Sequence, residues 1–118
     1  MIEIIAIPSI VLFVSFLWVK FPPKNVNYIY GYRTSSSMKN SYMWYWANFF
    51  SSRYLVFWCL INLISNIIVI LFIKSIPSNL INALVIIFVI GLLAIIPVTE
   101  IFLSKLKKQK NESNKTQT

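Results

Sequence analysis

The stretch from Tyr54 to Ile73, YLVFWCLINLISNIIVILFI, decides the fold class of this chain. It holds 20 consecutive residues without a charged side chain. About 20 helical residues, each rising about 1.5 Å, cross the hydrocarbon core of a bilayer, which is about 30 Å thick. The stretch therefore predicts a transmembrane helix.

Two further apolar stretches flank this one, at about 2–19 and 80–103. The later stretch is long enough to span with some tilt or with a kink at Pro97. A short polar turn at 74–79 joins the last two stretches as antiparallel helices. A cleaved signal peptide is the competing interpretation of the first stretch, but no Lys or Arg precedes its apolar core and no small-residue cleavage site follows it. The sequence predicts an all-α membrane protein with three transmembrane helices.

The composition excludes several classes of protein. The chain has 118 residues, of which 58% are hydrophobic and 12% charged, so most of its surface must be solvated by lipid. It has no His, one Cys and three acidic residues, which leaves few groups for a metal site or an acid–base pair. We expect a protein that is not an enzyme and that has no metal site and no cofactor.

The basic residues fall into two groups of five, separated by the single Lys74. The five loop residues are Lys20, Lys24, Arg33, Lys39 and Arg53, and the five tail residues are Lys105, Lys107, Lys108, Lys110 and Lys115. Because cytoplasmic segments hold the excess of Lys and Arg, three crossings place the loop and tail in the cytoplasm and the N-terminus outside. The polar tail, 105–118, is predicted to be disordered and, with the loop, to bind anionic lipids rather than nucleic acid.

The long segment between the first two spans, 21–53, is unusually aromatic. It holds 10 of the chain's 19 aromatic residues, and Trp and Tyr favour the membrane–water boundary. Aromatic side chains recur at helical spacing after Met38, which predicts an amphipathic helix lying in the cytoplasmic interface and leading into the second span. Such a helix serves equally well as an aromatic anchor or as a binding surface.

The same segment carries a recognisable motif. The run FPPKNVNYIYGYRT at 21–34 is followed by SMKN at 37–40 and by Trp-x-x-Ala-Asn at 44–48. This pattern resembles the signature of the SdpI family of bacterial membrane proteins. In that family an Asn-x-x-x-Gly-x-Arg-Thr motif precedes a Trp-x-x-Ala-Asn element that opens a transmembrane helix. The matching residues here are Asn27, Gly31, Arg33, Thr34, Trp44, Ala47 and Asn48.

The resemblance implies a function in the bacterial cytoplasmic membrane. The named member of the family protects a producing cell from a secreted peptide toxin and relays the toxin's presence by holding a repressor at the membrane. An SdpI-like chain would confer immunity by binding a peptide toxin, with signal transduction as a second role. A phage-type holin and a small oligomeric transporter or channel subunit are the alternatives, and expression causing rapid lysis would favour the holin.

Two charged residues are candidate site residues. Arg33, together with Asn27 and Thr34, would shape a polar site at the cytoplasmic ends of the helices; binding a lipid phosphate or capping a helix is the alternative. Glu100 is the only acidic residue deep within a span, so a pair with Arg33 or Arg53 would offset its desolvation. Glu100 could instead reach water or pair with Lys105.

Three polar residues lie near the middle of the second span. Asn62, Ser65 and Asn66 are expected to share one helix face that looks into the bundle or toward another copy of the chain. A water-lined pathway, formed by an oligomer, is the functional alternative. Gly91 in the third span has no small residue four positions away, which gives no support for a glycine-driven dimer.

Overall fold

The computed structural model of the chain describes residues 2–27 and 29–117, with side chains up to residue 115 in the last helix. Within these ranges it consists of four helices and no strand: α1 (Glu3–Lys20), α2 (Ser41–Phe72), α3 (Ser78–Leu93) and α4 (Ile95–Gln117). Within the same ranges, three segments are long and apolar enough to cross a membrane, and α3 together with α4 up to Lys115 forms one of them. The predicted all-α membrane fold with three transmembrane helices is confirmed.

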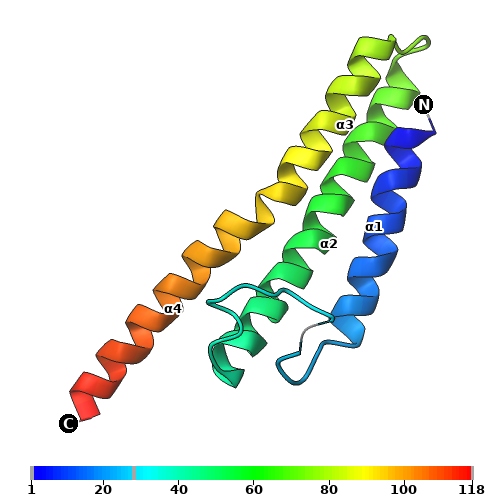
Figure 1. Ribbon diagram of the computed structural model, residues 1–118. Helices are drawn as coiled ribbons and strands as arrows, with labels where there is room; N and C mark the ends of the chain where they lie inside the picture. The colour runs from blue at the N-terminus through cyan, green and yellow to red at the C-terminus, as the bar shows by residue number, and fades with distance from the viewer. Residues whose placement is uncertain (1, 28, 118) are drawn as a thin grey trace.

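The helices form an elongated bundle that measures 65 × 25 × 19 Å. As Figure 1 shows, α1 and α2 run antiparallel side by side, while α3 and α4 follow one another along α2 as a third rod. The N-terminus lies near the α2–α3 turn, and the loop between α1 and α2 lies at the other end, toward which α4 runs. This arrangement places the basic loop and tail at one end of the bundle and Lys74 at the other, as three crossings require.

The predicted interfacial helix differs from the one observed. It begins at Ser41 rather than near Met38, and it is the first part of α2, which continues without a break for 32 residues to Phe72. No Gly or Pro interrupts this stretch, so the backbone hydrogen bonds continue from the loop end into the span. The Asn40 side chain caps the helix by accepting a 2.9 Å hydrogen bond from the Met43 N–H. The interfacial segment is therefore an extension of a transmembrane helix.

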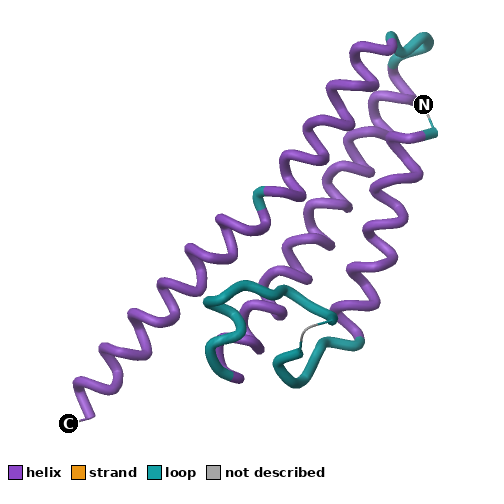
Figure 2. Tube along the Cα trace, in the orientation of Figure 1, coloured by secondary structure: helices purple, strands orange, loops and turns teal. Residues whose placement is uncertain are grey.

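The third rod breaks at Ala94, between α3 and α4, where Figure 2 shows a short non-helical link. The cause is the predicted one, Pro97. Proline has no N–H to donate, and its ring crowds the carbonyl four residues earlier, which is that of Leu93. The break therefore lies three residues before the proline.

The tail was predicted to be disordered, but α4 continues as a helix to Gln117. Lys, Gln and Glu are strong helix formers, and no Gly or Pro follows Pro97. The tail also contacts α2, because the Lys110 ammonium lies over the Tyr42 ring, 4.4 Å from its centroid. The polar composition that predicted disorder is equally compatible with a helix that extends from a span.

A packed cluster of buried apolar side chains lies at the loop end of the bundle. It consists of Tyr32, Met43, Ala47 and Leu103, with Trp18, Phe102 and Leu106 packed against it. The rings of Phe50 and Phe102 stack beside it with centroids 4.5 Å apart. Side chains from α1, α2, α4 and the loop therefore meet in one cluster, which fixes the loop against three helices.

The opposite half of the bundle is held by side chains that donate to backbone carbonyls. Asn66 Nδ2 donates to the Ile4 carbonyl at 2.7 Å, and Trp58 Nε1 donates to the Phe88 carbonyl at 3.0 Å. Gly91 makes room for this contact, since a Cβ there would overlap the Trp58 ring. Gly91 thus serves the packing of α3 on α2 within the chain.

The three polar residues of α2 do not all share one environment. Asn62 and Asn66 are buried, and Asn62 Nδ2 donates to the Trp58 carbonyl at 2.9 Å. Ser65, by contrast, is exposed. At about 100° per residue, Ser65 lies about 60° from Asn62 and about 100° from Asn66, on the far side of Asn62. The two Asn side chains look into the bundle, and Ser65 does not.

Candidate functional site

The motif of the loop folds around the buried side chain of Asn48. Its Oδ1 accepts a 2.7 Å hydrogen bond from the Tyr32 backbone N–H and a 3.2 Å bond from the indole N–H of Trp18. Its Nδ2 donates to the Trp44 carbonyl at 2.9 Å. A buried amide needs such partners, and these three engage both of its ends. Asn48 thereby ties the loop and the end of α1 to α2.

Trp44 and Ala47 complete the same face of α2. Both are fully buried, and Trp44 Nε1 donates to the Pro23 carbonyl at 2.7 Å. Residues three and four apart lie together on one side of a helix, which is why the Trp-x-x-Ala-Asn spacing brings these side chains and Asn48 against the loop. The two prolines that end α1 are thus anchored on α2.

Gly31 is required by the backbone and by its neighbours. Its φ is +110°, in the region that L side chains rarely adopt. A Cβ at this position would lie 2.6 Å from Asn48 Oδ1 and 2.7 Å from Pro23 Cγ. Any other residue would push the loop away from the side chain that holds it.

Asn27 and Thr34 shape turns within the loop. Asn27 Oδ1 accepts hydrogen bonds from the N–H groups of Ile29 at 2.9 Å and Tyr30 at 2.7 Å. Thr34 and Ser37 bond reciprocally: the Thr34 N–H donates to Ser37 Oγ at 2.8 Å and the Ser37 N–H to Thr34 Oγ1 at 3.2 Å. Tyr28 of the motif run lies outside the described residues. These polar side chains are already engaged with the loop's own backbone.

Arg33 differs from the other motif residues. Its side chain is exposed, and it makes no hydrogen bond or ion pair with any residue of the described ranges 2–27 and 29–117. Its neighbour Tyr32 is buried in the core, whereas the Arg33 side chain is exposed. Asn27 and Thr34 support the loop around Arg33 rather than joining it in a shared polar site.

Glu100 pairs with a residue that the sequence reasoning missed. The Tyr32 hydroxyl donates to Glu100 Oε1 at 2.9 Å, and Thr34 and Ser36 also lie beside the carboxylate. The expected partners Arg33, Arg53 and Lys105 form no ion pair with it among the described residues. Burial, followed by the neighbouring Glu100, raises the pKa of Tyr32 above its usual range.

A signal for Tyr32 was present in the sequence. It stands inside the motif between Gly31 and Arg33, and a tyrosine in an interface presents an apolar ring with a polar tip that needs a partner. The only acidic residue deep within a span was the obvious acceptor. The expectation of an Arg–Glu ion pair instead favoured Arg33, the residue next to Tyr32.

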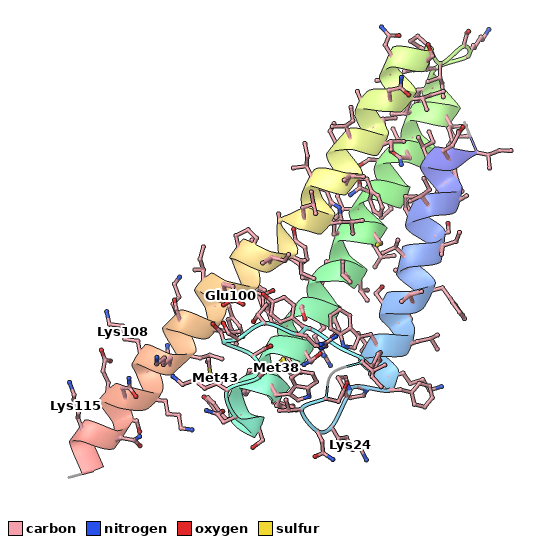
Figure 3. All side chains as sticks on the ribbon, in the orientation of Figure 1. Lys24, Met38, Met43, Glu100, Lys108 and Lys115 are labelled. Carbon is pink, nitrogen blue, oxygen red and sulfur yellow. The ribbon has the colours of Figure 1, made fainter. Side chains whose placement is uncertain are left out.

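Three hollows open at this end of the bundle. One, of about 360 Å³, lies between the end of α1 and α2. The other two, of about 230 and 220 Å³, lie between the start of α2 and α4, and Lys39 and Lys107 line both. A hydrogen bond and charge repulsion from Lys107 lower the pKa of Lys39 below its usual range. Met43 also lines both of these hollows, and Figure 3 shows it between α2 and α4, while Lys24, Lys108 and Lys115 project outward.

Comparison with known proteins gives one match. The model of the SdpI/YfhL protein family matches residues 24–99, which hold the motif, α2, α3 and the first turn of α4. No curated protein and no solved structure matches the chain. Because the family model covers more than half of the sequence, the chain belongs to the SdpI/YfhL protein family.

Proposed function

We propose that this chain confers resistance to a secreted antimicrobial peptide by binding, in the cytoplasmic membrane of a bacterium, with Arg33 as the recognition residue. The observation that carries the proposal is the contrast within the motif. Six of its seven residues pack or form hydrogen bonds within the loop and the start of α2. Arg33 is exposed on the surface of this structure.

The chemistry of Arg33 indicates what it would bind. A guanidinium group offers five N–H donors in a planar fork and pairs bidentately with a carboxylate or phosphate. An acidic side chain or the C-terminal carboxylate of a peptide fits this fork. The turn made by Thr34 and Ser37 and the bond from Tyr32 to Asn48 hold the backbone on either side of Arg33, which reduces the ordering cost of binding.

Binding accounts for the site better than bond-making chemistry. Among the described residues, no three His, Cys, Asp or Glu side chains gather into a metal-ligating group. Glu100, the acidic residue beside the loop, accepts a hydrogen bond from Tyr32. The proposal therefore requires no catalytic step, no metal and no cofactor.

The proposed orientation follows from charge. The end of the bundle that carries the loop and α4 holds ten of the eleven Lys and Arg residues. The preference of cytoplasmic segments for Lys and Arg places this end in the cytoplasm and the N-terminus outside. Arg33 would then meet a peptide that has entered the membrane, and the same exposed surface would be open to a soluble signalling partner.

The polar residues of α2 favour a binding protein over a channel subunit. Asn62 and Asn66 donate to the carbonyls of Trp58 and Ile4 inside the bundle, so their amides are engaged without lining a water-filled pathway. Flux through proteoliposomes that disappears in Asn66→Leu would favour the channel instead. Rapid lysis on expression would favour a holin.

The decisive experiment compares matched charge removals in a host challenged with its own secreted peptides. Arg33→Ala is expected to make the host as sensitive as a deletion strain, while Lys108→Ala, which removes an exposed charge from α4, keeps full protection. Immunoblots of membrane fractions must show equal amounts of both variants. Full protection by a normally inserted Arg33→Ala protein would refute the proposal.

A further inference from the structure

A hollow lies between the end of α1 and α2, and Arg33 is not among the residues that line it. Its volume is about 360 Å³. Its walls come from the end of α1, the two prolines and one face of α2, and they are formed by Val19, Pro22, Pro23, Lys24, Tyr45, Asn48, Phe49, Ser52 and Arg53. The hollow therefore combines two cations with apolar and aromatic walls.

Arg53 is held in a fixed orientation at this hollow. Its guanidinium carbon lies 3.6 Å from the centroid of the Phe49 ring, and Nη1 donates to the Phe49 carbonyl at 3.3 Å. A guanidinium group has five N–H donors, so this single hydrogen bond leaves most of the fork available. A stacked, half-buried arginine loses little freedom when it binds an anion.

The hollow also lies at a defined depth. Arg53 precedes the end of α2 at Phe72 by 19 residues, which corresponds to about 29 Å of helix and to the thickness of a hydrocarbon core. Asn66 of α2 contacts Ile4 of α1, and from that shared level Arg53 lies about 20 Å along α2 and Lys20 about 24 Å along the antiparallel α1, so Lys20 lies slightly beyond Arg53. A ligand in the hollow would meet Arg53 and Lys24 where lipid phosphates lie.

We propose that this hollow binds the phosphate group of one anionic phospholipid. Arg53 and Lys24 contact the phosphate, the Tyr45 hydroxyl supplies a further donor, and Val19 and Pro22 pack against the first methylene groups of an acyl chain. This differs from the general attraction of anionic lipid to surface lysines, which needs no particular geometry.

A lipid in this position would hold α1 and α2 together at the point where the loop leaves the membrane. A ligand that binds only the folded state stabilises it in proportion to the logarithm of its concentration. The purified protein should therefore unfold at a higher temperature as phosphatidylglycerol is added to the detergent. The site stands apart from peptide recognition, so it can exist whether or not Arg33 binds a toxin.

Native mass spectrometry of the purified chain, with added phosphatidylglycerol, diacylglycerol or inorganic phosphate, tests the site. The wild type is expected to retain one phosphatidylglycerol and no diacylglycerol, and equimolar inorganic phosphate should not displace the lipid. Arg53→Gln should weaken retention about tenfold, because a bidentate charged contact is lost. Lys24→Gln should weaken it about threefold, and Lys108→Gln, the matched charge removal on α4, should leave it unchanged.

Three results would overturn the site. If Lys24→Gln and Lys108→Gln weaken lipid retention equally, the attraction is diffuse. If diacylglycerol is retained as well as phosphatidylglycerol, the phosphate is not recognised. If equimolar inorganic phosphate displaces the lipid, the hollow is a site for free anions. Arg53→Lys guards against a folding defect, since it keeps the charge and loses the fork. Without lipid it should unfold cooperatively at a temperature slightly below that of the wild type, because the stack on Phe49 is lost, and it should retain phosphatidylglycerol to an intermediate degree.

Discussion

The two ends of this bundle are built by different means. At the loop end, Asn48, Trp44 and Tyr32 join segments far apart in the sequence, and they surround a buried apolar cluster. At the other end, large apolar side chains face outward, as in Phe72, which is 82% exposed, and Leu71, which is 74% exposed. Few hydrogen bonds, such as that from Asn66 to Ile4, cross between helices there.

The difference follows from the solvent. In hydrocarbon, an apolar side chain gains little by leaving lipid for protein, so helix association depends on close packing and a few hydrogen bonds. Where the chain leaves the hydrocarbon core, water restores the hydrophobic effect and a core can form. The motif of the family lies at the end where a specific fold can be built. The following predictions test this contrast, from the largest effect to the smallest.

Asn48→Ala should be the most damaging substitution. It leaves the Tyr32 backbone N–H and the Trp18 indole N–H without their acceptor. At about 1–3 kcal/mol for each buried group, we expect a loss of about 3 kcal/mol of folding free energy. Denaturant unfolding in detergent measures the loss, and limited proteolysis should cut the loop faster. Resistance of the loop equal to wild type would contradict the central role of Asn48.

Gly31→Ala should cost about 2 kcal/mol, since it combines an unfavourable φ with crowding against Asn48. Gly91→Ala is the comparison outside the loop, where α3 packs on the middle of α2, the backbone is helical and the Trp58 ring must move. We expect faster proteolysis of the loop for the first variant and an unchanged loop for the second. The same proteolysis pattern for both would mean that the loop and the α2–α3 contact are coupled more tightly than the contacts indicate.

Tyr32→Phe should cost about 1 kcal/mol, because the hydrogen bond to Glu100 is charge-assisted but partly exposed to solvent. The raised pKa of Tyr32 also predicts a pH dependence. The folded state favours the neutral phenol, so its contribution is complete below about pH 10 and declines as the pH rises above that value. Thermal unfolding between pH 8 and about 11 should show a smaller decline for Tyr32→Phe than for the wild type.

Asn66→Leu should have the smallest effect, about 0.6 kcal/mol, since hydrogen bonds between transmembrane helices contribute little on average. The free energy of unfolding in detergent should change by no more than this, with the loop as resistant to protease as in the wild type. A loss as large as that of Asn48→Ala would remove the proposed distinction between the two ends.

The sequence predicts the spans because each is a run of apolar residues, a local property. It also locates the motif, and the structure brings Gly31, Trp44, Ala47 and Asn48 together as neighbours. The partner of Glu100 was missed although the motif contains Tyr32, since the two residues are 68 positions apart and charge alone favoured an arginine. The lengths of α2 and α4 were underestimated. The aromatic residues before the second span and the polar residues of the tail are also compatible with helices that continue beyond the membrane.

The continuity of α2 has a mechanical consequence. A helix of 32 residues without Gly or Pro has no hinge, so it moves as a stiff rod about 48 Å long. A tilt of about 10° about its Phe72 end therefore shifts its Ser41 end, with the capping residue Asn40 and the loop that precedes it, by about 8 Å. The third rod cannot transmit a tilt in this way, because the break at Ala94 separates its two halves. Of the two, only α2 can act as a lever between the faces of the membrane.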